Sequence, residues 1–135
     1  MILIKIKLDR SEIHGLGCFA REFVKKGQLV WRFDENFDVA FKKEYVDKLP
    51  EATKENFLNY IYISKTTGDY ILCSDDSRFF NHDDNPNVSC VIPEGAKNNE
   101  LVCFATRDIN EGEELTNDYR DFDAESAEGL VPYVH

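Results

Sequence analysis

Short apolar runs separated by glycine-containing turns most constrain the fold of this chain. In the first run, apolar residues alternate with lysines at period two, which indicates a strand buried on one face. Bulky and β-branched residues recur in four later runs, and a polar connector at 93–99 predicts that the last two form a hairpin. In the second run, Leu29, Trp31 and Phe33 are predicted to share the apolar side. The predicted strands cover residues 2–8, 28–33, 70–73, 88–92 and 101–105.

The middle of the chain changes to a helical period. Apolar residues recur three and four positions apart on both sides of Pro50, which interrupts the pattern. They are Phe41, Tyr45, Val46 and Leu49 before the proline, and Phe57, Leu58, Ile61 and Tyr62 after it. Two short helices are therefore predicted within an insert at about 41–64. Together with the strands, they predict a mostly β fold with a minor α component.

Size and charge limit the possible partners. The chain has 135 residues, of which 42% are hydrophobic, and this suits one compact domain with its own core. Its net charge of −10 argues against autonomous binding to nucleic acid or to an anionic membrane, because those partners require a basic face. A cationic partner fits better, although solubility alone explains the charge equally well. No apolar run approaches the roughly 20 residues that span a bilayer.

The four cysteines are widely spaced and include no Cys-x-x-Cys pair. A zinc ribbon and a redox motif are therefore not indicated. We interpret most of Cys18, Cys73, Cys90 and Cys103 as small buried side chains. The default expectation is a reducing, intracellular setting, either cytoplasmic or, in a eukaryotic cell or host, nuclear.

Residues 78–87 combine two adjacent phenylalanines with polar side chains and a turn-forming Asn-Pro-Asn. The phenylalanines are expected to fix the segment to a core, while Asn81 and His82 offer hydrogen-bonding groups to a ligand. A second candidate is the turn at Gly15, Leu16 and Gly17, because glycines let a ligand approach main-chain amides. A Gly-x-Gly sequence alone is more often an ordinary turn. The residues by themselves thus predict a binding loop without identifying its ligand.

Three segments, taken in order, resemble motifs of the SET domain of protein-lysine methyltransferases. Residues 11–20 match its Gly-x-Gly segment, residues 78–87 match Arg-Phe-x-Asn-His-x-x-x-Pro-Asn, and residues 112–119 match Gly-Glu-Glu-Leu-Thr-x-Asp-Tyr. The resemblance implies a single SET domain over residues 1–135, built of small curved β-sheets, with a C-terminal tail at about 120–135. It also implies a knot-like crossing, in which the C-terminal segment passes beneath a preceding loop.

The resemblance further implies S-adenosylmethionine as the cofactor. The backbone of Gly15, Leu16 and Gly17 would cradle the methionine part of the cofactor, and a side chain at position 17 would obstruct it. Asn81 would hold the amino group of the cofactor with its side-chain amide. His82 would present backbone groups to the adenine ring.

Tyr119 matches the catalytic tyrosine of the family. Methyl transfer is an in-line displacement, so the protein must align a neutral amine with the methyl group and exclude water. An apolar channel beside a sulfonium would lower the lysine pKa from about 10.4, and solvent could take the proton. Tyr119 therefore need not be a strong base, and no metal is needed.

The chain departs from the family pattern around the expected lysine channel. Asp83 and Asp84 replace a frequent Ser-Cys, and no cysteine follows Cys103, which excludes the zinc module that often completes the channel. Trp31 and Phe33 are candidate aromatic residues of the channel. Cys90 and Asn117 occupy positions where the family often has an aromatic residue that limits the number of methyl groups. In the tail, either Phe122 or Tyr133 could close the site.

The resulting prediction is an S-adenosylmethionine-dependent enzyme that methylates the ε-amine of lysine in a protein substrate. A substrate with basic surroundings, such as a histone tail, is favoured because acidic residues follow Tyr119 closely. These are Asp118, Asp121, Asp123, Glu125 and Glu128. No direct nucleic-acid or membrane partner is predicted, and the oligomeric state is left open.

Two alternatives belong to other functional classes. The first is a catalytically silent SET-like module that binds the cofactor or a peptide. The second is a hard-metal site for hydrolysis, whose ligands would be Asp75, Asp76, His82, Asp83 and Asp84.

Overall fold

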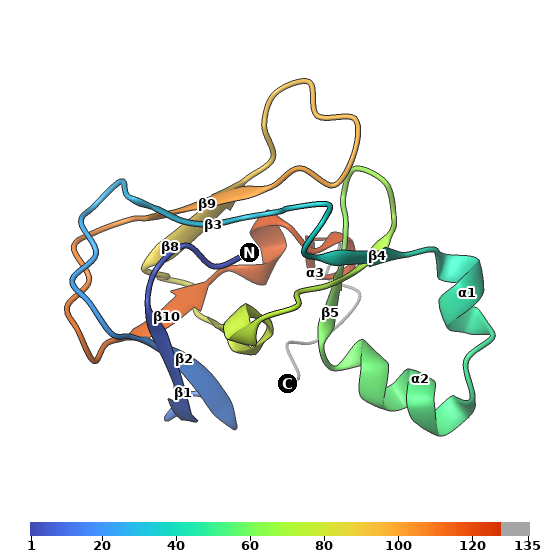
Figure 1. Cartoon of the computed structure of the whole chain (residues 1–135), viewed down its shortest axis with the longest axis horizontal. Helices are drawn as coiled ribbons and strands as arrows, with labels where there is room; N and C mark the ends of the chain where they lie inside the picture. Colours follow the sequence, from blue (N-terminus) through green and yellow to red (C-terminus); the bar gives the residue numbers. More distant parts are fainter. Residues whose placement is uncertain (128–135) are drawn as a thin grey trace.

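A computed structural model describes residues 1–127 and consists of three small β-sheets with short helices between them (Figure 1). The first sheet has the order β1 (Ile6–Arg10), β2 (Leu16–Ala20), β10 (Glu114–Asn117), β7 (Asn81–His82). The second has the order β3 (Leu29–Arg32), β9 (Val102–Ala105), β8 (Val88–Val91). The third has the order β4 (Val39–Phe41), β6 (Tyr70–Leu72), β5 (Ile61–Ile63). The predicted mostly β architecture is confirmed.

The insert between β4 and β5 carries two helices, α1 (Lys43–Asp47) and α2 (Glu51–Leu58). Pro50 is the N-cap residue of α2, where its missing N–H costs no hydrogen bond. The helical prediction for Ile61 and Tyr62 is wrong. Both residues lie in β5 and pair with Leu72 and Ile71 of β6, because this pairing completes the third sheet.

The remaining helices are one-turn elements close to the polar loop and the C-terminal segment. They are the 3₁₀ helices η1 (Asp76–Phe79) and η2 (Tyr119–Asp121), and the α-helix α3 (Ala124–Ala127). None of the helices in residues 1–127 has the length and apolar character needed to cross a bilayer.

The N-terminal segment contributes to two sheets and does not form the single strand that was predicted over residues 2–8. Ile2 forms a single bridge to Trp31, and the Leu3 amide donates to the Val30 carbonyl (2.8 Å), so the first residues lie along the second sheet. The regular strand β1 begins only at Ile6 and pairs with β2.

Strand β3 also differs from the simple alternation. Its register against β9 shifts between Leu29 and Trp31, so Val30 and Trp31 are both buried, while Leu29 is exposed. A β-bulge of this kind turns consecutive side chains to the same side. The predicted hairpin of β8 and β9 is confirmed, with Val88 opposite Ala105 and Val91 opposite Val102.

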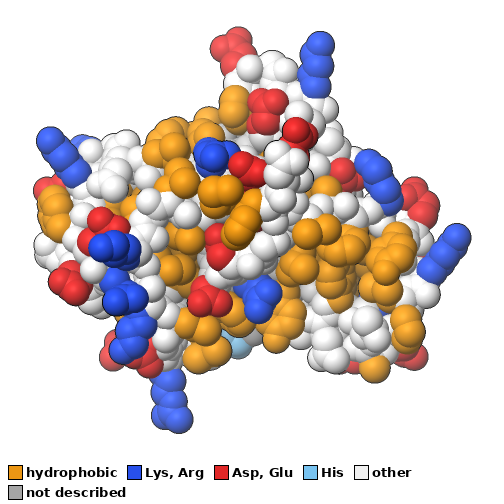
Figure 2. Space-filling model, in the orientation of Figure 1, with side chains coloured by type: hydrophobic (Ala, Val, Ile, Leu, Met, Phe, Trp, Pro, Cys, Tyr) orange, Lys and Arg blue, Asp and Glu red, His pale blue; other side chains and the backbone are white. Residues whose placement is uncertain are grey.

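The main core lies between the first two sheets, whereas the insert is peripheral. Strand residues in this core include Cys18, Val30, Val88, Ala105 and Leu115. Helix α2 buries no residue, and α1 buries only Val46. Tyr45 and Leu58 on these helices are exposed, and Figure 2 shows hydrophobic side chains gathered over this side of the molecule. The insert therefore contributes little to the main core.

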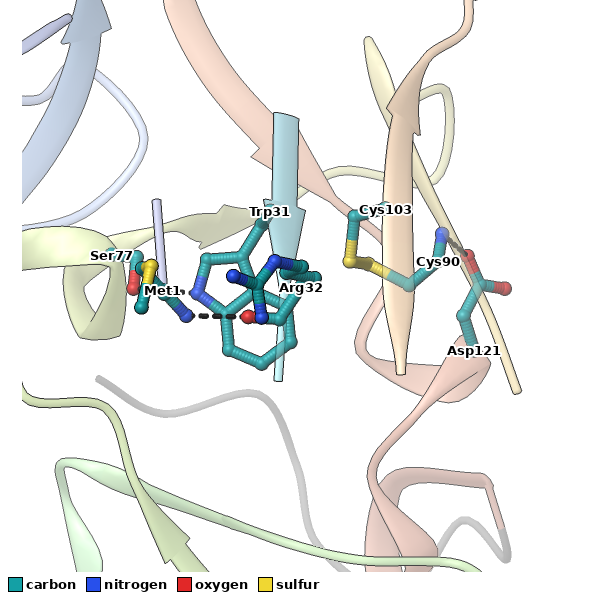
Figure 3. The surroundings of a disulfide bond; sticks show 7 residues. All are labelled: Met1, Trp31, Arg32, Ser77, Cys90, Cys103 and Asp121. Atoms are coloured by element: carbon teal, nitrogen blue, oxygen red, sulfur yellow. Dashed lines mark hydrogen bonds between the residues drawn. A yellow bond between two sulfur atoms is a disulfide. The ribbon is translucent and has the colours of Figure 1, made fainter. Parts of the chain in front are cut away.

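All four cysteines are buried, but two of them form a disulfide that their spacing did not predict. Cys90 and Cys103 face each other on β8 and β9 and are covalently joined (Figure 3). Cys18 and Cys73 are free thiols, and burial raises the pKa of each to about 12. These two match the interpretation of small buried side chains.

Reduction of the Cys90–Cys103 disulfide is expected to lower the free energy of unfolding by about 1–3 kcal/mol, because the closed loop restricts the unfolded chain. The loop is short, with a sequence separation of 13 residues, and this keeps the effect modest. Urea unfolding of the oxidised and reduced protein measures it, with mass spectrometry to confirm the redox state. Equal unfolding midpoints for the two forms would contradict the expectation.

Candidate functional site

The polar loop and the C-terminal motif meet where β7 pairs with β10. The pairing is parallel, with Asn81 opposite Thr116 and His82 opposite Asn117, and the Asp83 amide extends it by donating to the Asn117 carbonyl (3.0 Å). Tyr119 begins η2 two residues after β10 ends. Two of the three matching motifs are therefore adjacent in space, and β2 brings the third beside them by pairing with β10.

Asn87 attaches the end of the polar loop to β10. Its Nδ2 donates to the Glu114 carbonyl (2.8 Å), and its Oδ1 accepts from the Thr116 amide (2.9 Å). Its own amide donates to Thr116 Oγ1 (3.2 Å). The sequence predicted only a turn for this residue, yet its buried side chain supplies the hydrogen bonds that a neighbouring strand would supply.

Asn81 joins the loop to the Gly-x-Gly turn. Its Nδ2 lies 3.1 Å from the carbonyl oxygens of both His14 and Leu16, and 2.9 Å from Oε2 of Glu114. Because these acceptors surround the NH₂ group, the amide oxygen is the atom that can accept a hydrogen bond from a ligand. The structure thus brings Asn81 together with Leu16, as the resemblance implied.

The two glycines of the turn meet different requirements. Gly15 has a φ of +47°, in the left-handed region that glycine adopts without strain. At Gly17 the constraint is space, because a Cβ there would lie 2.4 Å from Oε2 of Glu114 and 3.1 Å from Nδ2 of Asn81, and the carboxylate would have to shift. From the sequence, a side chain at position 17 was expected to obstruct the cofactor. In the structure, such a side chain would first collide with Glu114 of the protein itself.

His82 links the loop to the backbone of the C-terminal segment. Its Nδ1 accepts a hydrogen bond from the Tyr119 amide (3.1 Å), which places the ring proton of the neutral imidazole on Nε2. Nε2 in turn lies 2.7 Å from Oδ1 of Asp84. The imidazole therefore positions Tyr119, while the contact of the His82 backbone with adenine stays a prediction.

Tyr119 is buried, and its hydroxyl donates to the Phe80 carbonyl (2.6 Å). Burial raises the pKa of this hydroxyl well above its ordinary value, and the negative charge of Asp123 adds to the effect. The phenol is therefore neutral at physiological pH and does not act as a strong base. Its oxygen keeps lone pairs for a second contact.

A cavity of about 140 Å³ lies beside Tyr119 and is lined mainly by apolar and aromatic side chains. Four of the predicted channel residues line it, namely Trp31, Cys90, Asn117 and Phe122. Phe33 does not line it and packs against the core instead, so its role as a channel residue stays a prediction. Tyr133 lies outside the described residues.

Three residues that line the cavity each have one buried side-chain polar atom without a partner among the described residues. The atoms are Oη of Tyr62, Oδ1 of Asn117 and Nε of Arg78. Tyr62 was predicted as a helical core residue, so sequence reasoning missed its place at the cavity. Buried polar atoms rarely stay unpaired, so these three atoms are the buried polar groups of the cavity residues whose hydrogen bonds are not made within residues 1–127.

The disulfide forms another part of the cavity wall. Cys103 lies opposite Trp31 in the pairing of β3 with β9, and the Trp31 Nε1 donates to Ser77 Oγ (3.1 Å) on the side away from the sulfurs (Figure 3). The Cys90 amide contacts Oδ2 of Asp121 at 3.4 Å. These contacts hold η2 and the indole on either side of the disulfide.

The hard-metal alternative lacks a suitable cluster. Across residues 1–127, no three His, Cys, Asp or Glu side chains gather closely enough to hold an ion. Asp75 accepts hydrogen bonds from the Ile2 and Ser77 amides, and Asp84 forms an ion pair with Arg120. Asp75 and Asp84 therefore serve structural contacts on different parts of the loop.

Comparison with known proteins identifies a family and a shared fold. Residues 15–120 match the model of the SET domain. The chain is 31% identical over 123 residues to a Plasmodium falciparum protein named as a candidate histone-lysine N-methyltransferase, a match that covers 87% of this chain and 2% of that protein. It is 27% identical over 120 residues to the Dictyostelium discoideum histone-lysine N-methyltransferase set1, covering 86% of this chain and 8% of that protein.

A solved structure supports the same fold. A crystal structure of a Plasmodium falciparum protein described as a candidate histone methyltransferase aligns with a TM-score of 0.61 at 24% identity. The alignment covers 87% of this chain and 95% of that one. In contrast, the chain spans less than a tenth of the length of the two sequence relatives.

Replacement of Asn87 by alanine is expected to destabilise the protein by about 2 kcal/mol, because the Thr116 amide and the Glu114 carbonyl would lose their buried partner. Asn85→Ala is the matched control, since Asn85 is exposed in the same loop. Urea unfolding of both variants measures the difference. Equal stability of the two variants would show that Asn87 does not hold β10.

Proposed function

This chain belongs to the SET-domain family, and we propose that it transfers a methyl group from S-adenosylmethionine to the ε-amine of a lysine in a protein substrate. The observation that supports this function most is the meeting of Asn81, His82 and Tyr119 at one junction beside an apolar cavity. The domain is homologous to histone-lysine N-methyltransferases. The activity, the cofactor and the boundaries of the domain at 1–135 are parts of the proposal.

The groups around Asn81 fit the amino-acid part of the cofactor. The amide oxygen of Asn81 can accept from an ammonium group, while its NH₂ group is engaged by the turn and by Glu114. The Gly15, Leu16 and Gly17 backbone lies directly alongside. When bound, the cofactor supplies an electrophilic methyl group on a sulfonium.

The cavity would receive the lysine side chain. Its walls at Trp31 and Phe122 exclude water, and an apolar site favours the neutral amine over the ammonium ion. The lysine ammonium would first lose a proton to solvent, and the lone pair of the neutral amine would then form the new N–C bond while the S–C bond breaks with its electrons going to sulfur.

Tyr119 would orient the reacting groups and would not remove the proton. Its hydroxyl hydrogen is directed at the Phe80 carbonyl, so its lone pairs face the other way. An oxygen held in this manner stabilises positive charge on a neighbouring methyl-sulfonium group without reorganisation. The raised pKa of the phenol keeps it in the neutral form throughout.

Tyr119→Phe is expected to lower methyl transfer at least about 100-fold, because the oriented oxygen is lost while the ring remains. Incubation with labelled S-adenosylmethionine and mixed basic proteins, histones included, measures the transfer. Tyr45→Phe is the matched control, since Tyr45 is exposed on α1. Wild-type protein that binds the cofactor but labels no substrate would favour the catalytically silent binding module.

The substrate is proposed to carry basic residues around its target lysine, because Asp123 and Glu125 lie at the cavity. Both would attract a cationic segment through a field that salt screens. KM for a lysine- and arginine-rich peptide is expected to rise several-fold between about 50 and about 300 mM salt. Glu125→Gln should raise this KM, whereas Glu111→Gln on a remote turn should not. An acidic best substrate, with a KM independent of salt, would overturn this part of the proposal.

A further inference from the structure

We propose that Glu114 is a positioning residue for the cofactor, an inference that rests on the proposed function. Its carboxylate lies between the turn and the polar loop and contacts both. Oε1 and Oε2 lie 2.8 and 2.9 Å from Oγ of Ser11, and Oε2 lies 2.9 Å from Nδ2 of Asn81. One side chain of β10 thus connects the two segments that would hold the amino-acid part of the cofactor.

Ser11 passes this contact to the backbone of the turn. Its hydroxyl donates to Glu114 and accepts from the amides of Ile13 (2.9 Å) and His14 (3.2 Å). Its own amide donates to the Gly15 carbonyl at 2.8 Å. Each hydrogen-bonding capacity of the hydroxyl is therefore used. The path of the chain through residues 11–15 depends on the carboxylate that orients this hydroxyl.

Glu114 also helps to determine which way the Asn81 amide faces, together with the carbonyl oxygens of His14 and Leu16. A carboxylate accepts hydrogen bonds and cannot donate them, so it requires the NH₂ group of Asn81 on its own side. The Asn81 oxygen is then directed away from the carboxylate, where it can accept from an ammonium group. A glutamine at position 114 could donate as well as accept, so only the two backbone carbonyl oxygens would still select this orientation of the Asn81 amide.

The absence of a side chain at Gly17 agrees with this assignment. The Cβ of any other residue at position 17 would lie only 2.4 Å from Oε2 of Glu114, which is closer than two such atoms can approach. Glycine at this position therefore leaves room for the carboxylate as well as for a ligand. The negative charge adds an attractive potential for the ammonium group of the cofactor.

Glu114→Gln is expected to weaken the binding of S-adenosylhomocysteine about tenfold or more in calorimetric titrations. The affinity for an S-adenosylhomocysteine analogue that lacks the amino group should change less than about twofold, because this analogue has no ammonium group to donate to the Asn81 oxygen. In turnover, KM for S-adenosylmethionine should rise while kcat at saturation stays near that of the wild type. Glu113→Gln is the matched control, since Glu113 is exposed and its carboxylate accepts from the Asn110 amide on the neighbouring turn.

The outcomes separate this inference from the proposed function. If wild-type protein binds neither S-adenosylmethionine nor S-adenosylhomocysteine, the proposed function fails. Two results with a wild-type protein that binds both would overturn the positioning role. In the first, Glu114→Gln binds both ligands as tightly as the wild type does. In the second, Glu114→Gln loses as much affinity for the analogue without the amino group as it loses for S-adenosylhomocysteine. Should Glu114→Gln not fold, Ser11→Ala tests the same connection from the turn, and equal affinity of that variant and the wild type for S-adenosylhomocysteine overturns it.

Discussion

The pairing of β10 with two strands that precede it is the interaction on which the rest of the structure depends. Strand β10 runs antiparallel to β2, with Leu115 opposite Cys18, and parallel to β7. The parallel contact is only two residues long, which is too short to be stable by itself. Asn87 and the buried Leu115 side chain hold β10 in this position, so the loop, the Gly-x-Gly turn and Tyr119 share one support.

The fold was predictable where local pattern and tertiary pairing agree. The hairpin of β8 and β9 and the first helix of the insert follow from period and turn signals. The pattern failed where a residue serves a distant partner. Ile61 and Tyr62 continue a helical spacing but pair with β6, and the bulge in β3 turns Trp31 and Val30 to the same side. The order of strands in the sheets was not predicted, since spacing carries no information about non-local pairing.

At the site, the sequence motifs identified the residues proposed to contact a ligand. They were less informative about the residues that hold those contact residues in place. Asn81, His82 and Tyr119 were named from the sequence, and the structure brings them together; their roles toward cofactor and substrate stay predictions. Asn87 and Glu114 belong to the same motifs, yet nothing in their spacing shows that their side chains turn inward. The pairing of Cys90 with Cys103 was missed for a related reason, because only the register of β8 against β9 places them opposite each other.

The hydrogen bond between Ser11 and Glu114 joins residues that are 103 positions apart. Contacts of such long range slow folding, because a large loop must close before they form. During synthesis, the Gly-x-Gly turn leaves the ribosome long before the strand that completes its surroundings. We therefore expect the growing chain to collapse around its early strands first, and the cofactor site to be among the last parts of the molecule to acquire its final geometry.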